Sequence, residues 1–180
     1  VLSVGKPNVL IDLRVVDQKG EDVPAGQIGE LWARGPNVMK GYLNLPDETT
    51  GALSDGWLHT GDIARIDDEG YVYLLDRLKD MIITGGENVY SSEVEAALHQ
   101  HSAVSEAAVI GVADEKLGEA LFAVIVLREN MVVDEMELIE HCRPLIGGYK
   151  IPRNYAFVEV LPKSALGKPL KGELRKTFGT

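Results

Sequence analysis

The chain has 180 residues, of which 45% are hydrophobic, so it is long and apolar enough for one ordinary domain or two small ones. Its 18 Lys and Arg residues against 28 Asp and Glu residues give a net charge of −10, and an acidic surface repels the phosphates of nucleic acids. We therefore expect no nucleic-acid partner, whereas nucleotide binding stays open because local cations and backbone N–H groups decide it.

The first part of the chain has the pattern of an all-β unit. Short runs of alternating apolar and polar residues are separated by turn residues, such as those at 17–20 (DQKG) and 67–70 (DDEG). Prolines and glycines punctuate residues 36–51, which predicts a long loop with little room for a helix. The strand-like runs lie at residues 9–15, 28–34, 62–67 and 71–75.

From residue 78 onward, strand-like runs alternate with helical spacing, which predicts an α+β unit and a boundary near residues 77–80. Ser92 and Glu95 have the spacing of a capping box, and Pro144 ends a helix predicted over 133–143. Cys142 lies in the apolar rows of that helix and is predicted to be a buried structural thiol. Strand-like runs lie at 81–83, 107–112, 121–127 and 155–160, and further helical spacing lies at 94–101 and 170–178.

The sequence carries no visible targeting signal. Its longest apolar run, residues 120–127, has the length of a strand rather than of a membrane span, and no signal peptide is visible. A single cysteine excludes an intramolecular disulfide and a Cys-rich zinc site, so we expect a protein of the reducing cytoplasm. The chain starts at Val1 without a methionine and runs directly into strand-like sequence, so we expect a fragment that lacks its N-terminal portion.

Three polar segments are candidates for chemistry. In residues 56–62 (GWLHTGD), glycines indicate sharp bends, and the Asp62 carboxylate can accept hydrogen bonds from the vicinal hydroxyls of a ribose. In residues 76–88 (DRLKDMIITGGEN), Arg77 offers a donor fork, and the paired glycines allow close approach of a ligand. In residues 162–168 (PKSALGK), a loop lysine suits an anionic site. Taken singly, the segments are explained more simply as a turn, a charge cluster and a surface loop.

In their order and spacing, however, the three segments together resemble the late core motifs of the adenylate-forming superfamily. That superfamily includes acyl-CoA synthetases, firefly luciferases and the adenylation domains of nonribosomal peptide synthetases. The resemblance covers essentially the whole chain, and residues 82–90 (IITGGENVY) look most like bacterial acyl-CoA synthetases of the fatty-acid and aryl-acid types. It implies that residues 1–77 end an N-terminal domain as a small distorted antiparallel β-barrel. Residues 78–180 are then a mobile α+β C-terminal domain with a short mixed sheet flanked by helices, and the hinge lies near 77–80.

The resemblance also implies a reaction in two steps. A carboxylate attacks the α-phosphate of ATP to give an acyl-adenylate and pyrophosphate, and the thiol of CoA then gives the thioester and AMP. Asp62 and Arg77 match residues that bind the ribose of ATP or AMP. Lys168 matches the catalytic lysine, and a fixed cation suits the first step because that step brings two anions together. Lys79 matches the hinge position about which the C-terminal domain swings between the steps.

Binding of CoA is expected at several positions of the second unit. Gly85 and Gly86 match the segment that lines the pantetheine tunnel in the family. Relatives that hold the 3′-phosphate of CoA with an arginine have it where this chain has Ile151, so Lys150 or Arg153 is the expected substitute.

Other parts of the family pattern differ or lie outside the sequence. An arginine that often follows the catalytic lysine is replaced by Lys171, which retains the charge. The glycine-rich phosphate loop and the Tyr-Gly-x-Thr-Glu-type segment are missing, so we expect the Mg²⁺ ligands and the acyl pocket N-terminal to Val1. No metal site is expected in these 180 residues.

Three functions stay open. The favoured one is the C-terminal portion of an ATP-dependent acyl-CoA synthetase for a fatty or related acid, with an aryl acid as the alternative. Its partners are then the carboxylic acid, ATP, CoA and the missing N-terminal domain. The second is an adenylation domain that feeds a carrier protein, or a luciferase-like oxygenase, and the third is a non-catalytic interaction module. The chain alone is expected to be inactive.

Overall fold

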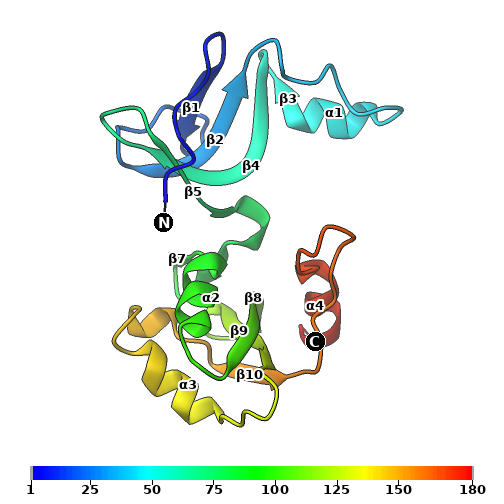
Figure 1. The fold of residues 1–180 in the computed structure, drawn as a ribbon. Coiled ribbons are helices and arrows are strands. Elements are labelled where there is room, and N and C mark those ends of the chain that lie inside the picture. Colours follow the sequence, from blue (N-terminus) through cyan, green and yellow to red (C-terminus); the bar gives the residue numbers. More distant parts are fainter. Residues whose placement is uncertain (1, 180) are drawn as a thin grey trace. The chain divides into compact units, whose positions relative to one another are not determined.

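The computed structural model describes residues 2–179 and contains two compact units, one ending at Lys79 and the other beginning at Asp80 (Figure 1). Each unit has its own sheet and its own apolar core, and each is described by itself. Within the described residues, no helix is long and apolar enough to cross a membrane.

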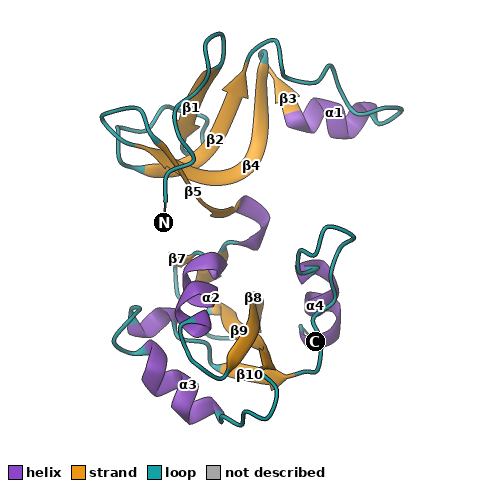
Figure 2. Cartoon of the chain, in the orientation of Figure 1, coloured by secondary structure: helices purple, strands orange, loops and turns teal. Residues whose placement is uncertain are grey.

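The first unit is a curled five-stranded antiparallel sheet (Figure 2). Strand β2 lies between β1 and β4, and both β3 and β5 also pair with β4. The register shifts once between β2 and β4 and once between β4 and β5, and such irregularities increase the local twist. Val15, Leu31, Ala64 and Val72 form its small core. The elements are β1 (Asp12–Val16), β2 (Ile28–Arg34), α1 (Pro46–Ala52), β3 (Leu53–Ser54), β4 (Trp57–Ile66) and β5 (Val72–Arg77).

The helix α1 was not predicted, and the expectation of little room for a helix in residues 36–51 is wrong. Pro46 lies at the start of the helix, where its missing N–H costs nothing and its fixed φ favours the helical turn. Asp47 and Glu48 follow in the first turn, where the positive end of the helix dipole stabilises carboxylates. The proline therefore begins this helix instead of preventing it.

The second unit is built on a five-stranded mixed sheet flanked by helices, and the predicted α+β class is confirmed. Strands β8 and β9 form a long antiparallel hairpin, β10 runs parallel to β9, and the short β6–β7 hairpin joins β9 at the pair Thr84↔Gly118. The elements are β6 (Ile82–Thr84), β7 (Glu87–Val89), α2 (Ser91–His99), β8 (Val104–Asp114), β9 (Gly118–Leu127), α3 (Glu135–Cys142), β10 (Asn154–Phe157) and α4 (Lys171–Phe178). Two 3₁₀ turns cover Leu78–Asp80 and Gly148–Lys150.

Helices cover both faces of this sheet. Val109 and Ile125 belong to the cluster that contains Leu138 of α3, whereas the neighbouring Ile110 belongs to the cluster that contains Leu174 of α4. Successive residues of a strand point to opposite faces, so the two clusters lie on opposite sides of β8 and β9. This double burial explains why the two strands read as nearly continuous apolar runs.

The structure does not place Ser92 at the N-cap position that the predicted capping box of Ser92 and Glu95 requires. Helix α2 begins at Ser91 with Tyr90 as its N-cap, two residues before the predicted N-cap Ser92, and Tyr90 makes no side-chain cap hydrogen bond. The Glu95 carboxylate instead accepts the Val109 N–H of β8 at 2.8 Å, a tertiary contact that local spacing does not reveal. Helix α3 does have a side-chain cap, since Asp134 accepts a backbone N–H of its first turn.

Cys142 is fully buried in the cluster around α2 and α3, which confirms the prediction of a structural thiol. Burial raises the pKa of this thiol, and only the thiolate reacts readily with alkylating reagents. We therefore expect Cys142 to resist iodoacetamide near neutral pH in the folded chain and to react fully in concentrated urea. Mass spectrometry of the two samples gives the labelled fraction, and rapid labelling of the folded chain would contradict this packing.

Candidate functional site

Asp62 and Arg77 face each other across the β4–β5 hairpin. They are register partners, and the Arg77 Nε lies 3.0 Å from the Asp62 Oδ1. The Arg77 Nη1 also donates to the Thr60 carbonyl at 3.1 Å, which fixes the guanidinium plane. Both side chains remain partly exposed, at 54% for Arg77 and 29% for Asp62. The hairpin thus presents a carboxylate and a guanidinium together, with free oxygen and N–H positions for a polar ligand.

The bends predicted around this segment are present. Gly56 and Gly61 have φ values of +79° and +67°, in the left-handed region that glycine adopts without a steric penalty. The Gly61 N–H donates to the Glu30 Oε1 at 3.1 Å, at the point where the pairing of β4 with β2 shifts register. The bend therefore turns β4 immediately before Asp62.

A second layer of side chains next to the bend, made of Glu30, Trp32 and His59, was not predicted from the sequence. The rings of Trp32 and His59 stack with 3.9 Å between centroids and 7° between planes. The Trp32 Nε1 donates to the Glu30 Oε2 at 3.0 Å, so one carboxylate holds both the indole and the Gly61 N–H. The alternation of Glu30 and Trp32 on one face of β2 was the available signal. A cavity of about 650 Å³ adjoins this layer and is lined in part by Tyr42, His59, Thr60 and Leu78.

Lys168 lies in a hairpin loop between β10 and α4. The Ser164 N–H donates to the Lys168 carbonyl at 2.8 Å, and the Leu170 N–H donates to the Pro162 carbonyl at 2.8 Å. Gly167 closes the turn with φ at +78°. The backbone of the loop is therefore held by its own hydrogen bonds, while the Lys168 side chain is exposed.

The three lysines of residues 162–171 have different surroundings. The Lys163 Nζ pairs with a Glu106 carboxylate oxygen at 2.6 Å, and the Lys171 Nζ pairs with the Glu95 Oε1 at 2.7 Å. Across residues 2–179, the Lys168 ammonium has no such partner. The structure thus distinguishes Lys168 as the lysine whose charge is available to an anion.

Gly85 and Gly86 form the turn between β6 and β7. Their φ values are +59° and +86°, so both positions favour glycine for conformational reasons alone. The Gly85 N–H donates to the Leu117 carbonyl at 2.9 Å. Gly85 lines a cavity of about 780 Å³ in the second unit together with Tyr149 and Arg153, whereas Gly86 is exposed beside it.

Lys150 and Arg153, the two predicted CoA cations, are not equivalent. The Lys150 Nζ donates to both Glu93 carboxylate oxygens, at 2.8 and 2.7 Å. Desolvation lowers the pKa of Lys150, but the hydrogen bond and charge of Glu93 outweigh it and the net pKa is raised. Arg153 is exposed and forms no ion pair within the described part of the chain. The Arg153 guanidinium at the cavity is therefore available to an anion, whereas Glu93 already neutralises the Lys150 ammonium.

The predicted residues fall in both units. Asp62 and Arg77 belong to the first unit, and Lys168 and the predicted CoA-binding residues belong to the second. Lys79 is the last residue of the first unit and lies within the 3₁₀ turn Leu78–Asp80. Residues 2–179 contain no group of three His, Cys, Asp or Glu side chains placed to hold a metal ion.

Comparison with known proteins identifies relatives along nearly the whole chain. Residues 1–43 match the model of the AMP-binding enzyme family, and residues 93–168 match the AMP-binding enzyme C-terminal domain. The chain is 46% identical over 177 residues to a feruloyl-CoA synthase of Amycolatopsis sp. The matched region covers 98% of this chain and 36% of the relative. It is 47% identical over 173 residues to a long-chain-fatty-acid–CoA ligase of Yersinia pestis. That match covers 96% of this chain and 31% of the relative.

The fold has a close counterpart among solved structures. ATP-bound MatB from Rhodopseudomonas palustris superimposes with a TM-score of 0.92 at 37% identity, over 98% of this chain and 36% of the other. The chain therefore spans about a third of the length of the proteins that it matches.

Proposed function

Because the chain belongs to the AMP-binding family of adenylate-forming enzymes, we propose that it is the C-terminal part of an ATP-dependent acyl-CoA synthetase. The whole enzyme converts a carboxylic acid, ATP and CoA into acyl-CoA, AMP and pyrophosphate in the cytoplasm. The observation that carries this proposal is the 46–47% identity to CoA ligases over 96–98% of the chain. The acid is a fatty or aryl acid, since the two relatives are named for acids of these classes.

In the first step, the acid's carboxylate oxygen attacks the α-phosphorus of ATP and the bond to pyrophosphate breaks. Asp62 accepts hydrogen bonds from the ribose hydroxyls, and Arg77 both donates to the ribose and holds Asp62 in place. Lys168 contacts the substrate carboxylate and the phosphate oxygens, where its unpaired charge offsets their repulsion. Magnesium is expected in the whole enzyme, and residues 2–179 contain no cluster of His, Cys, Asp or Glu side chains that could hold it.

In the second step, the thiol of CoA attacks the acyl carbon and AMP leaves. We assign the pantetheine to Gly85 and Gly86, whose lack of side chains permits close approach, and the 3′-phosphate to Arg153. Lys79, at the end of the first unit, is the proposed hinge between the two steps.

The proposed activity is tested with the full-length enzyme. Pyrophosphate exchange and acyl-CoA formation are measured with ATP and a panel that includes ferulate, dodecanoate and 2-succinylbenzoate. We expect both activities with at least one acid. Adenylate formation without transfer to CoA would instead favour the adenylation domain of a carrier-protein system or a luciferase-like enzyme, and no adenylate formation would favour the non-catalytic module.

The 180-residue chain alone is expected to show no pyrophosphate exchange with any acid of the panel. It carries the proposed ribose-binding pair and Lys168, but the proposed phosphate loop and acyl pocket lie outside it. The comparison is made at equal molar concentration with the full-length enzyme, and circular dichroism establishes that the chain is folded. Measurable turnover by the folded chain would overturn this assignment of the missing sites.

Arg153→Ala is expected to raise KM for CoA about tenfold, because a charge-assisted hydrogen bond to the 3′-phosphate is lost. Lys150→Ala is expected to change it less than about twofold, since Glu93 already neutralises that ammonium. Dephospho-CoA, which lacks the 3′-phosphate, is the matched ligand. The Arg153→Ala effect should disappear with it, and a tenfold effect that persists would place Arg153 elsewhere on CoA.

A further inference from the structure

The hairpin that carries Lys168 continues after two residues into α4 (Lys171–Phe178). This helix has eight residues and no side-chain cap at its start, and Leu174 is its one buried residue among those described. An isolated helix of this length is not stable in water, so tertiary contacts decide where it lies. The position of Lys168 therefore depends on what anchors the first turn of α4.

The anchor is a cluster around the first residue of the helix. The Lys171 Nζ lies 2.7 Å from the Glu95 Oε1 and donates to the Ser91 Oγ at 2.6 Å. The Lys171 and Glu95 side chains are only 13% and 20% exposed. The Glu95 Oε1 also accepts the Val109 N–H at 2.8 Å, so one carboxylate fastens α4 to both α2 and β8.

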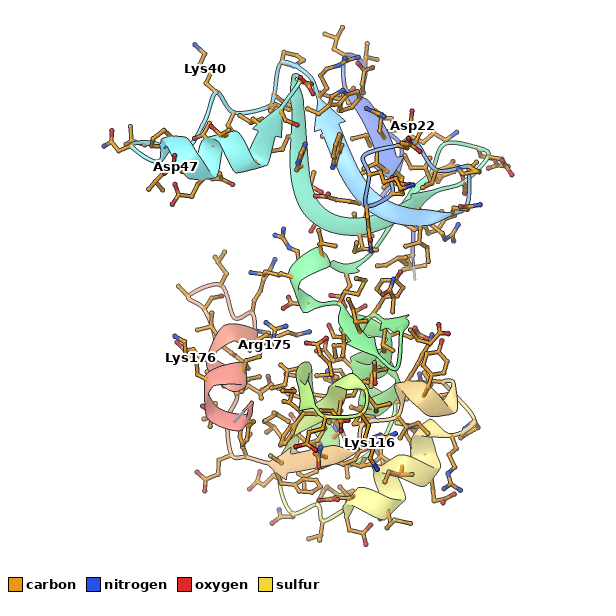
Figure 3. The ribbon with its side chains drawn as sticks, turned by 180° about the vertical axis from the view of Figure 1, so that it is seen from behind. Asp22, Lys40, Asp47, Lys116, Arg175 and Lys176 are labelled. Carbon is orange, nitrogen blue, oxygen red and sulfur yellow. The ribbon has the colours of Figure 1, made fainter. Side chains whose placement is uncertain are left out.

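A second ion pair acts one turn further along α4. The Arg175 Nη2 lies 2.9 Å from the Asp80 Oδ1, and the Asp80 side chain is 12% exposed. Figure 3 shows Arg175 directed from α4 toward the body of the second unit, whereas Lys176 points away from it. Helix α4 is thus held at both ends of its first turn, by Lys171 and by Arg175. The loop with Lys168 precedes these contacts and is exposed.

Building on the proposed function, we propose that Lys171 is a positioning residue for adenylation: through Glu95 and Ser91 it fixes the helix start from which Lys168 is presented. Lys171 itself binds no substrate, because Glu95 and Ser91 already hold its ammonium. Without these contacts of Lys171, the segment that joins Lys168 to α4 can move. A displacement of about 1 Å is enough to cost up to about 10²-fold in rate.

The test uses the full-length enzyme with Lys171→Met, which removes the charge, and Glu95→Gln, which keeps an oxygen for the Val109 N–H. Lys171→Arg is the conservative rescue, and Lys176→Met, an exposed lysine of the same helix, is the matched control. Pyrophosphate exchange and acyl-CoA formation from supplied acyl-adenylate are measured separately, with melting temperatures for every variant. The acid is whichever panel member the unsubstituted enzyme activates.

We expect Lys171→Met and Glu95→Gln to lower kcat for adenylation about 10- to 100-fold, with KM for ATP and the rate from supplied acyl-adenylate each changing less than about threefold. Lys171→Arg should recover most of the activity, and Lys176→Met should match the unsubstituted enzyme. Equal loss in both half-reactions, loss of soluble protein, or unchanged adenylation would each overturn the positioning role. An unsubstituted enzyme that forms no adenylate would refute the proposed function instead.

Discussion

In the full-length enzyme, Lys168→Ala is expected to lower the rate of acyl-adenylate formation about 10²- to 10³-fold, while thioester formation from supplied acyl-adenylate changes less than about twofold. The Lys168 ammonium has no partner among residues 2–179 and extends from an exposed loop. Its proposed contact with the carboxylate and phosphate oxygens exists only in the first step. Pyrophosphate exchange measures that step, and the supplied adenylate bypasses it.

Lys116→Ala is the matched control for this substitution, because Lys116 is another exposed loop lysine of the second unit that forms no ion pair with the described residues. Neither substitution removes a buried contact, so both variants should keep the melting temperature of the parent. An equal loss in the two half-reactions of Lys168→Ala would contradict the proposed role, as would full adenylation activity.

Asp62→Ala should raise KM for ATP roughly 10²-fold, since the two proposed hydrogen bonds between the ribose hydroxyls and this carboxylate would be lost, at about 1.5 kcal/mol or more each. The ribose is present in both ATP and the acyl-adenylate. The affinity for supplied acyl-adenylate should therefore fall in parallel, unlike the outcome for Lys168→Ala. Initial rates over a range of each nucleotide give both constants.

Asp68→Ala provides the matched control for Asp62, because Asp68 is an exposed carboxylate in the turn that joins the same two strands. Asp62 also forms the ion pair with Arg77, so Asp62→Asn, which keeps a hydrogen-bond acceptor without the charge, separates lost ribose contacts from a displaced guanidinium. An Asp62→Ala enzyme with unchanged KM for both nucleotides would refute the ribose-binding role.

Local sequence patterns predicted most strands and the helix around Cys142, because hydrophobic periodicity and turn residues act over a few positions. They failed where a contact with a residue distant in the sequence, or an unusual residue at a helix start, decided the structure. Helix α1 begins at Pro46, a residue taken as a helix breaker, and the short strand β7 was missed because two of its three residues, Glu87 and Asn88, are polar. The Glu95 side chain was assigned to its own helix start but binds β8.

By itself, the sequence determined the fold class and the order of Asp62, Arg77 and Lys168, which family resemblance turned into candidates for ribose binding and catalysis. Only the tertiary structure decided which cations are available. Lys150 is neutralised by a glutamate 57 positions away, and Lys171 is held at a serine 80 positions away. Such pairings depend on how the sheet brings distant segments together, so no local pattern predicts them. Lys168 is one of three lysines in residues 162–171, and among residues 2–179 it is the one of the three whose ammonium forms no ion pair.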